Sequence, residues 1–200
     1  MTYYFDSEKI ETTLKMSGQL IELIKTTNSS NAEIVVLCIG SDRSTGDSLG
    51  PVTGYRLEKY HIKNVYGTLR FPVHAANLSS AINSIYNKHK NPFIIAIDAS
   101  LGIPEHVGYI TLGTGPLTPG LGVQKKLPKV GNIHITGIVN SSHNMDYNLL
   151  QTTHLSTVVQ LADIIASVLF LALQHPAALT NVCSYMQLPP AQLYQQLLTS

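Results

Sequence analysis

The chain has 200 residues, of which 44% are hydrophobic and 12% are charged, and its formal net charge is +1. That length suits one domain with a sizeable core. A nearly neutral chain creates no long-range field that would attract nucleic acid or an anionic membrane, so we expect neither as a partner. The first residues show no basic region followed by an apolar core, so we expect no secretory signal.

The apolar and cysteine-containing stretches predict a soluble protein of a reducing compartment. Residues 158–173 are strongly apolar, but they contain Gln160 and Asp163 and fall short of the ~20 residues that span a bilayer. Cys38 and Cys183 form no metal or redox motif, so we expect buried, inert thiols. The predicted location is therefore the cytoplasm.

The first half of the chain predicts a helix, a buried strand and a second helix. Apolar residues at helical spacing predict a helix over 7–26, with Ser7 as its N-cap. The continuous apolar run 34–39 predicts a strand covered on both faces, as in the centre of a parallel sheet. A loop of small and polar residues follows, and Pro51 suits the first turn of a helix over 50–61.

The later elements continue this alternation. Strands are predicted over 65–73, 93–98, 107–113 and 133–139, helices over 77–88 and 155–174, and a last short helix after Pro190. Residues 115–131 are too rich in glycine and proline for regular structure, and loops of this length are usually functional. The alternation predicts a three-layer α/β/α sandwich with a mostly parallel sheet.

We expect one domain over residues 1–200, in which the core spans 34–174. An N-terminal helix lies within 1–30 and a C-terminal helix within 175–200. The apolar stripes of the first and last helices would cover either the sheet or a second copy of the chain, and both alternatives stay open.

Two aspartates are the strongest candidates for chemistry. Asp47 follows the first buried strand, and Asp98 is expected just past the end of the strand over 93–98. Open α/β sheets bind ligands at the carboxyl ends of their strands. Two carboxylates at close range shift each other's pKa values, so that one is ionised while the other holds its proton. Such a pair can activate water and protonate a leaving group, or bind a metal through oxygen.

Plainer interpretations of the same residues stay open. Asp47 could close an Asx turn or cap the following helix, and Asp42 with Arg43 could form an exposed ion pair of little energetic value. Ser48 lacks the GxSxG elbow of a nucleophile. No GxGxxG or P-loop pattern is present, so no nucleotide cofactor is predicted.

Three of the eight histidines deserve naming. His74 lies after the predicted strand 65–73, His143 follows the strand over 133–139, and His154 precedes the long last helix. His143 or His154 could approach the carboxylates as a metal ligand or a proton carrier. A loop histidine with only local hydrogen bonds is the plainer alternative for each.

Three segments carry a family resemblance. STGDSLGP at 44–51, GTLRFPVHAANL at 67–78 and IIAIDASLG at 94–102 closely resemble the YyaC-type sporulation proteins, a family related to the spore germination proteases. Asp47 in TGDSLGP and Asp98 in AIDAS match the two aspartates of those proteases. Residues 119–139 are similar to their glycine-rich loop, basic cluster and following strand.

The resemblance implies the fold shared by germination proteases and hydrogenase maturation proteases, a phosphorylase/hydrolase-like α/β/α sandwich. In the maturation proteases two acids and a histidine bind a metal, which implies Asp47, Asp98 and His154, with His143 as the second match. In the germination proteases the two aspartates act without a metal. This chain departs from them in being shorter and in having Gly46 where they have a proline.

The resulting hypothesis is a cytoplasmic endopeptidase of the sporulating cell or the spore interior, with Asp47 and Asp98 as its catalytic pair. Its substrate would be a protein, and the resemblance suggests the small acid-soluble spore proteins. One alternative is a maturation-type protease that depends on a divalent metal. The other is a regulatory protein that binds a partner through residues 115–131 without turnover.

Overall fold

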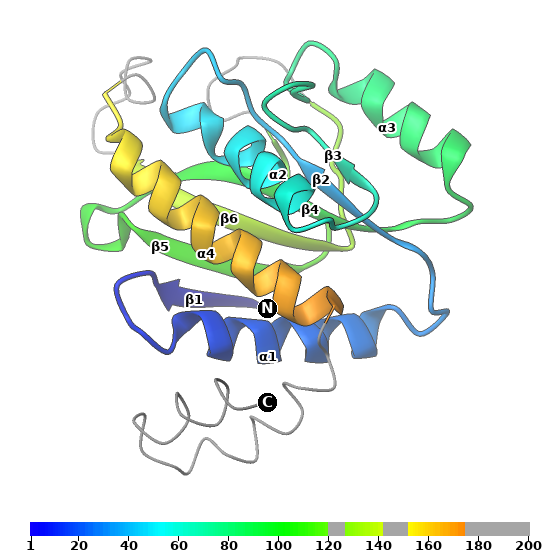
Figure 1. The fold of residues 1–200 in the computed structure, drawn as a ribbon, viewed down its shortest axis with the longest axis horizontal. Coiled ribbons are helices and arrows are strands. Elements are labelled where there is room, and N and C mark those ends of the chain that lie inside the picture. The colour runs from blue at the N-terminus through cyan, green and yellow to red at the C-terminus, as the bar shows by residue number, and fades with distance from the viewer. Residues whose placement is uncertain (120–126, 142–151, 175–200) are drawn as a thin grey trace.

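The computed structural model describes residues 1–119, 127–141 and 152–174 (Figure 1). His143, Cys183, the lysines at 125 and 126 and the predicted helix after Pro190 lie outside the described residues. The part of the domain prediction that concerns residues 175–200 therefore stays a prediction.

The described strands form one mixed sheet. They are β1 (Thr2–Asp6), β2 (Ile34–Cys38), β3 (Val65–Tyr66), β4 (Phe93–Gly102), β5 (Tyr109–Thr114) and β6 (Ile133–Ser141), and their order in space is β1-β5-β6-β4-β2-β3. Neighbours among β3, β2, β4 and β6 are parallel, whereas β5 runs antiparallel to both β6 and β1. The sheet is therefore mostly parallel, as predicted, with an antiparallel edge.

Helices cover both faces of the sheet, which confirms the α/β/α sandwich. α1 (Thr12–Thr27), α2 (Leu49–Lys59) and α4 (Leu155–Gln174) pack on one face, while α3 (Leu78–Lys88) packs on the other (Figure 1). Along β2 the side chains alternate between the two cores: Val36 and Cys38 face the larger one, and Val35 and Leu37 face the core under α3. This alternation explains why the strand is apolar on both faces.

The N-terminus differs from the prediction. Residues Thr2–Asp6 form β1 on the edge of the sheet, and the helix begins only at Thr12. Ser7 is not an N-cap: it is buried, its backbone N–H donates to the carbonyl of Gly108, and Gln160 bonds to its hydroxyl. The antiparallel pairing with β5 takes up the aromatic residues of this segment, which favour strands.

The strand predicted over 65–73 is mostly irregular. Only Val65 and Tyr66 pair with β2 in regular register, and Val73 forms an isolated bridge with Ile39. Gly67 interrupts the strand because its φ is +84°, a conformation that side chains with a Cβ rarely adopt.

The last described helix agrees with the predicted bounds, Leu155–Gln174. By length and composition it could cross a membrane, with a mean hydropathy of 2.0. Its buried stripe, which includes Val158, Leu161, Ile165 and Leu169, packs in the larger core. Burial of that stripe on the sheet is what a core helix of this composition requires.

Candidate functional site

The chain changes direction across the sheet between β2 and β4. From β2 the chain passes through α2 to β3, which lies at one edge of the sheet. From β4 it passes to β5 and β6, which lie on the other side of the paired strands β2 and β4. In open α/β sheets the crevice at such a switch point, beyond the carboxyl ends of the strands, is the usual ligand site. The loop that carries Asp47 follows β2 at this point.

Asp47 lies in a short 3₁₀ turn, η1 (Gly46–Ser48), which is folded back onto the end of β2. The N–H of Ser41 donates to the carbonyl of Asp47 at 3.0 Å. A Cβ on Gly40 would lie 2.0 Å from that carbonyl oxygen, so the close approach requires a glycine there. The loop is thereby fixed by its backbone.

The environment of Asp47 suits a proton-holding acid. Burial raises the pKa of its carboxyl group from 3.8 to about 6, and a backbone hydrogen bond from Ser41 partly opposes that rise. Asp47 does not cap α2, because Ser48 occupies the N-cap position and no side chain there makes a capping hydrogen bond. The hydroxyl of Ser48 donates to the carbonyl of Thr45, which favours a structural role for Ser48.

Asp98 lies inside a strand and not beyond one, which corrects the predicted position. β4 continues to Gly102 because residues 95–102 pair with β6 along its length. Asp98 is only 6% exposed, and its Oδ1 accepts a 2.9 Å hydrogen bond from the N–H of Ala99. Cα atoms of η1 lie within 8 Å of Cα atoms of β4, so the fold brings the segments that carry the two aspartates close together.

Asp98 begins a row of polar side chains that crosses the sheet. Its register partner on β6 is Thr136, whose partner on β5 is Thr111, whose partner on β1 is Tyr4. Register partners project from the same face. The hydroxyls of Thr136 and Thr111 are 2.7 Å apart, and Ser100 donates to Thr136 at 3.2 Å. No local sequence pattern predicts this row, since it depends on the pairing of four strands.

The polar row borders a hollow of about 500 Å³, lined in part by Tyr4, Ser100, Thr111 and Thr136. This volume lies within the range of about 300–1,000 Å³ that is usual for ligand sites. The aromatic rings of Tyr4 and His106 lie beside it, 5.4 Å apart. The line of register partners from Thr111 through Thr136 to Asp98 therefore connects the hollow with Asp98 across the sheet.

A metal site is not preformed in the part of the chain that the structure describes. No group of three or more His, Cys, Asp and Glu side chains there is arranged to hold a metal ion. Asp47, Asp98 and His154 therefore do not form such a group, and His154 is exposed just before α4. The Nδ1 atom of His74 accepts a local hydrogen bond from the N–H of Ala76. The three-ligand assignment stays a prediction.

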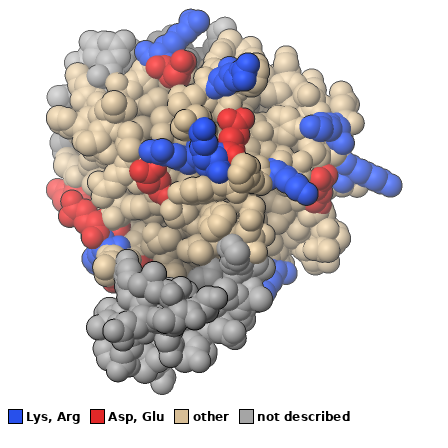
Figure 2. Space-filling view, in the orientation of Figure 1, with Lys and Arg blue, Asp and Glu red and all other residues tan. Residues whose placement is uncertain are grey.

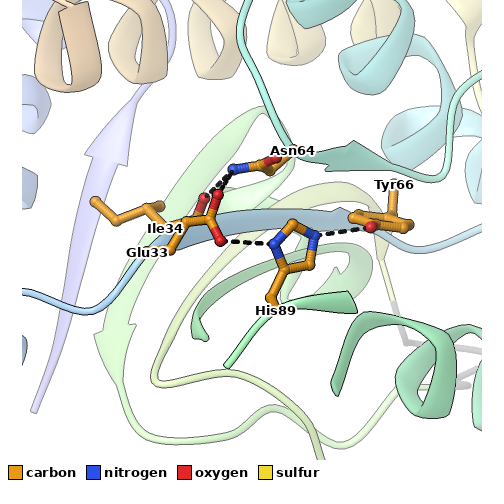
Figure 3. Close-up of polar contacts among 5 residues, drawn as sticks. All are labelled: Glu33, Ile34, Asn64, Tyr66 and His89. Carbon is orange, nitrogen blue, oxygen red and sulfur yellow. Dashed lines mark hydrogen bonds and ion pairs between the residues drawn. The ribbon is translucent and has the colours of Figure 1, made fainter. Parts of the chain in front are cut away.

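A second polar cluster, which the sequence analysis missed, lies at the opposite end of the sheet (Figure 3). His89 is 4% exposed; its Nδ1 lies 2.7 Å from the carboxylate of Glu33, and its Nε2 lies 2.9 Å from the hydroxyl of Tyr66. Asn64 donates to Glu33 at 2.8 Å. The hydrogen bond with His89 is the main reason why the pKa of Glu33 is lowered. These residues precede or join the strands, so the cluster fixes the amino ends of β2, β3 and β4.

Two other predictions concern charge and the thiol. Acidic and basic side chains alternate on the face shown in Figure 2, and neither sign covers a continuous area there. Asp42 and Arg43 are both exposed and form no ion pair with each other. Cys38 is fully buried, as predicted, and burial strongly raises the pKa of its thiol, which disfavours the reactive thiolate.

Comparison with known proteins identifies relatives. Over 135 residues the chain is 55% identical to the "Uncharacterized protein YyaC" of Bacillus subtilis (strain 168), an alignment that covers 66% of each chain. The crystal structure of a [NiFe] hydrogenase maturation protease HycI from Thermococcus kodakarensis KOD1 is also similar, with 16% identity and a TM-score of 0.45. That similarity covers 76% of this chain and 98% of the other.

The resemblance to YyaC-type proteins is thus confirmed. The family model described as "Protein of unknown function (DUF1256)" matches residues 3–168, which include most of β1, all of β2 to β6 and most of α4. The chain belongs to the DUF1256 family.

Proposed function

We propose that this protein is an endopeptidase of the sporulating cell or the spore interior, which cleaves a protein substrate through Asp47 and Asp98. The observation that supports the proposal is the proximity of the two segments that carry Asp47 and Asp98, whose side chains lie in different environments. Burial raises the pKa of Asp47 to about 6. Asp98 lies on β4, at one end of the row of hydroxyl-bearing side chains that begins with its register partner Thr136.

The two environments support different roles. An acid with a pKa of about 6 is partly protonated just below neutral pH and can deliver that proton to a leaving amine. Asp98 would serve as the base that accepts a proton from the attacking water. The water adds to the peptide carbonyl carbon, and the C–N bond then breaks as Asp47 protonates the amine nitrogen. Asp98 finally returns its proton to Asp47 through solvent.

The hollow beside Asp98 supports a peptide substrate. It lies next to the acid on the same face of the sheet and is lined by hydroxyl and aromatic groups, which can contact an extended chain. Small acid-soluble spore proteins are the proposed substrate because of the sequence similarity to germination proteases. The proposed location is the cytoplasm, and we propose no nucleic acid or membrane partner.

Two other functions remain candidates. A divalent metal would bind through Asp47, Asp98 and His154, which would require His154 to approach the crevice. A protein without turnover could instead bind a partner at the same crevice, or act as a dimer through a helical face.

A cleavage assay separates these functions. The purified protein is incubated with small acid-soluble spore proteins, with and without a chelator, and mass spectrometry identifies the products. We expect defined cuts in both samples. Cuts that disappear with the chelator and return with added metal would support the metal-dependent protease. A folded protein that makes no cut would contradict the proposal and favour the binding protein.

A further inference from the structure

A second cavity, of about 580 Å³, lies along the edge strand β3 and the segment that follows it. Its volume again falls within the range of about 300–1,000 Å³ typical of ligand sites. The polar and aromatic members of its lining are Glu58, Tyr66, Thr68, Arg70, Phe71, His74 and Asn77. Most of them belong to the segment GTLRFPVHAANL, to which no role has been assigned above.

The backbone holds this cavity wall in place. Thr68 and Phe71 exchange two backbone hydrogen bonds of 3.2 Å, which close a tight turn with Arg70 in it. A Cβ on Gly67 would lie only 1.7 Å from the carbonyl oxygen of Cys38, so glycine is required for this segment to pack onto β2. The wall is thus a built feature and not a loose loop.

Thr68 provides an unpaired polar group inside the wall. The residue is 3% exposed, and its Oγ1 atom is buried without a hydrogen-bond partner among the residues that the structure describes. Buried hydroxyl groups nearly always have a partner, so this one requires an explanation. Thr68 lines the cavity, so a group bound there would be the missing partner of its hydroxyl.

Two further side chains of the lining can donate hydrogen bonds. The guanidinium of Arg70 stacks on Phe71, 5.5 Å from the ring centre, and forms no ion pair with any carboxylate among the described residues. Because Nδ1 of His74 accepts a hydrogen bond, the neutral ring carries its proton on Nε2 and can donate it. Glu58 is the acidic member of the lining, and its exposed side chain is screened by water.

The cavity lies close to the proposed centre. Val73 bridges to Ile39, and the register of β2 with β4 places Ile39 beside Asp98. Two strand spacings separate the cavity wall from Asp98, which is about 10 Å. An extended chain covers that distance in about three residues.

We propose that this cavity binds an acidic side chain of the protein substrate, about three residues from the cleaved bond. Arg70 pairs with the carboxylate, while Thr68 and His74 donate hydrogen bonds to it. The inference rests on the proposed function for the identity of the ligand as a substrate, but the affinity of the cavity for a carboxylate can be tested without cleavage.

The test is a ¹H–¹⁵N NMR titration of the whole protein with N-acetyl-glutamate N′-methylamide and with its glutamine analogue. We expect saturable shifts within residues 66–77 for the glutamate compound and none for the glutamine compound. Arg70→Gln weakens binding by about tenfold and Thr68→Val by about fivefold. Lys90→Gln, which changes an exposed cation outside the cavity, leaves the affinity unchanged.

Equal shifts with both compounds, shifts outside residues 66–77, or full affinity in Arg70→Gln would overturn the inference. Arg70 is exposed, so its variant keeps the fold even if Thr68→Val does not. A protein that binds the glutamate compound but cleaves nothing would remove the peptidase and leave the carboxylate site. A protein that cleaves but fails this titration would remove only the carboxylate site.

Discussion

The polar side chains at the two ends of the sheet differ in how completely they are hydrogen-bonded. At the amino end, both ring nitrogens of His89 have partners, on Glu33 and on Tyr66. At the carboxyl end, burial raises the pKa of Asp47, and the hydroxyl of Thr68 has no hydrogen-bond partner.

This difference indicates separate roles for the two ends of the sheet. Polar groups that satisfy one another stabilise the fold, because each buried donor and acceptor recovers the hydrogen bond it lost from water. Groups that are buried with incomplete partners lower stability, and their partners can come from a ligand or a substrate. The predictions below test whether the amino end serves stability and the carboxyl end serves function.

The largest expected effect is the loss of cleavage in Asp98→Asn. An amide of the same shape cannot accept the proton from water, so the cleavage rate falls by a factor of about 10² to 10⁴ while the fold is retained. Asp42→Asn is the matched control, because Asp42 is exposed in the loop that carries Asp47. Peptide cleavage followed by mass spectrometry measures both. A full rate in Asp98→Asn would exclude the catalytic role of Asp98.

Asp47→Asn is expected to stabilise the protein at neutral pH. The carboxyl group titrates near 3.8 when unfolded and near 6 when folded, so folding takes up a proton between these values. The free energy of unfolding therefore falls as the pH rises from about 4 to about 6. The variant removes this dependence and gains on the order of 2 kcal/mol at pH 7.

Urea unfolding of the wild type and Asp47→Asn at several pH values between 4 and 7.5 measures the difference. If both proteins show the same dependence on pH, the pKa of Asp47 is not raised by the fold.

His89→Leu tests the amino end. The substitution removes the partner of the Tyr66 hydroxyl and of one Glu33 oxygen, so the free energy of unfolding falls by about 1–3 kcal/mol. Cleavage in the folded variant stays at the wild-type rate. Glu33→Gln is the control, since its amide oxygen still accepts from His89 while the charge and the acceptor for Asn64 are lost. Loss of cleavage in a stable His89→Leu would contradict the division between the ends.

The smallest effect concerns Thr68. Thr68→Val removes a buried hydroxyl that has no partner, so we expect a gain of about 1 kcal/mol and a Tm higher by about 2–4 °C. Thr53→Val is the matched substitution, because the hydroxyl of Thr53 is buried and donates to the carbonyl of Leu49 at 2.8 Å. Calorimetry should show the two variants shifting in opposite directions. A lower Tm for Thr68→Val would mean that its hydroxyl has a partner.

Much of the fold could be predicted because the apolar patterns agree with burial. The run 34–39 alternates between two cores, and the stripe of α4 packs on the sheet, as their spacing indicated. The strand at the N-terminus was missed because five residues carry too little periodicity, and its pairing with β5 is a tertiary effect. The prediction of a strand over 65–73 was wrong beyond Tyr66, because Gly67 has a left-handed backbone and lies in close contact with the carbonyl of Cys38.

The candidate site was predictable only in part. Two aspartates after apolar runs could be found by inspection, and the fold brings their segments together. The row from Asp98 to Tyr4 depends on the register of four strands, and the burial of His89 and Thr68 depends on packing between distant segments. Neither leaves a local pattern in the sequence.

The most direct test of the two-aspartate centre is the pH dependence of kcat/KM for peptide cleavage between pH 4.5 and 8. We expect the rate to fall as the pH rises through about 6, where Asp47 loses the proton that the leaving amine requires. Asp47→Asn should lack both this limb and most of the activity. A wild-type rate that stays constant across this range, together with full activity in Asp47→Asn, would contradict the two-aspartate centre.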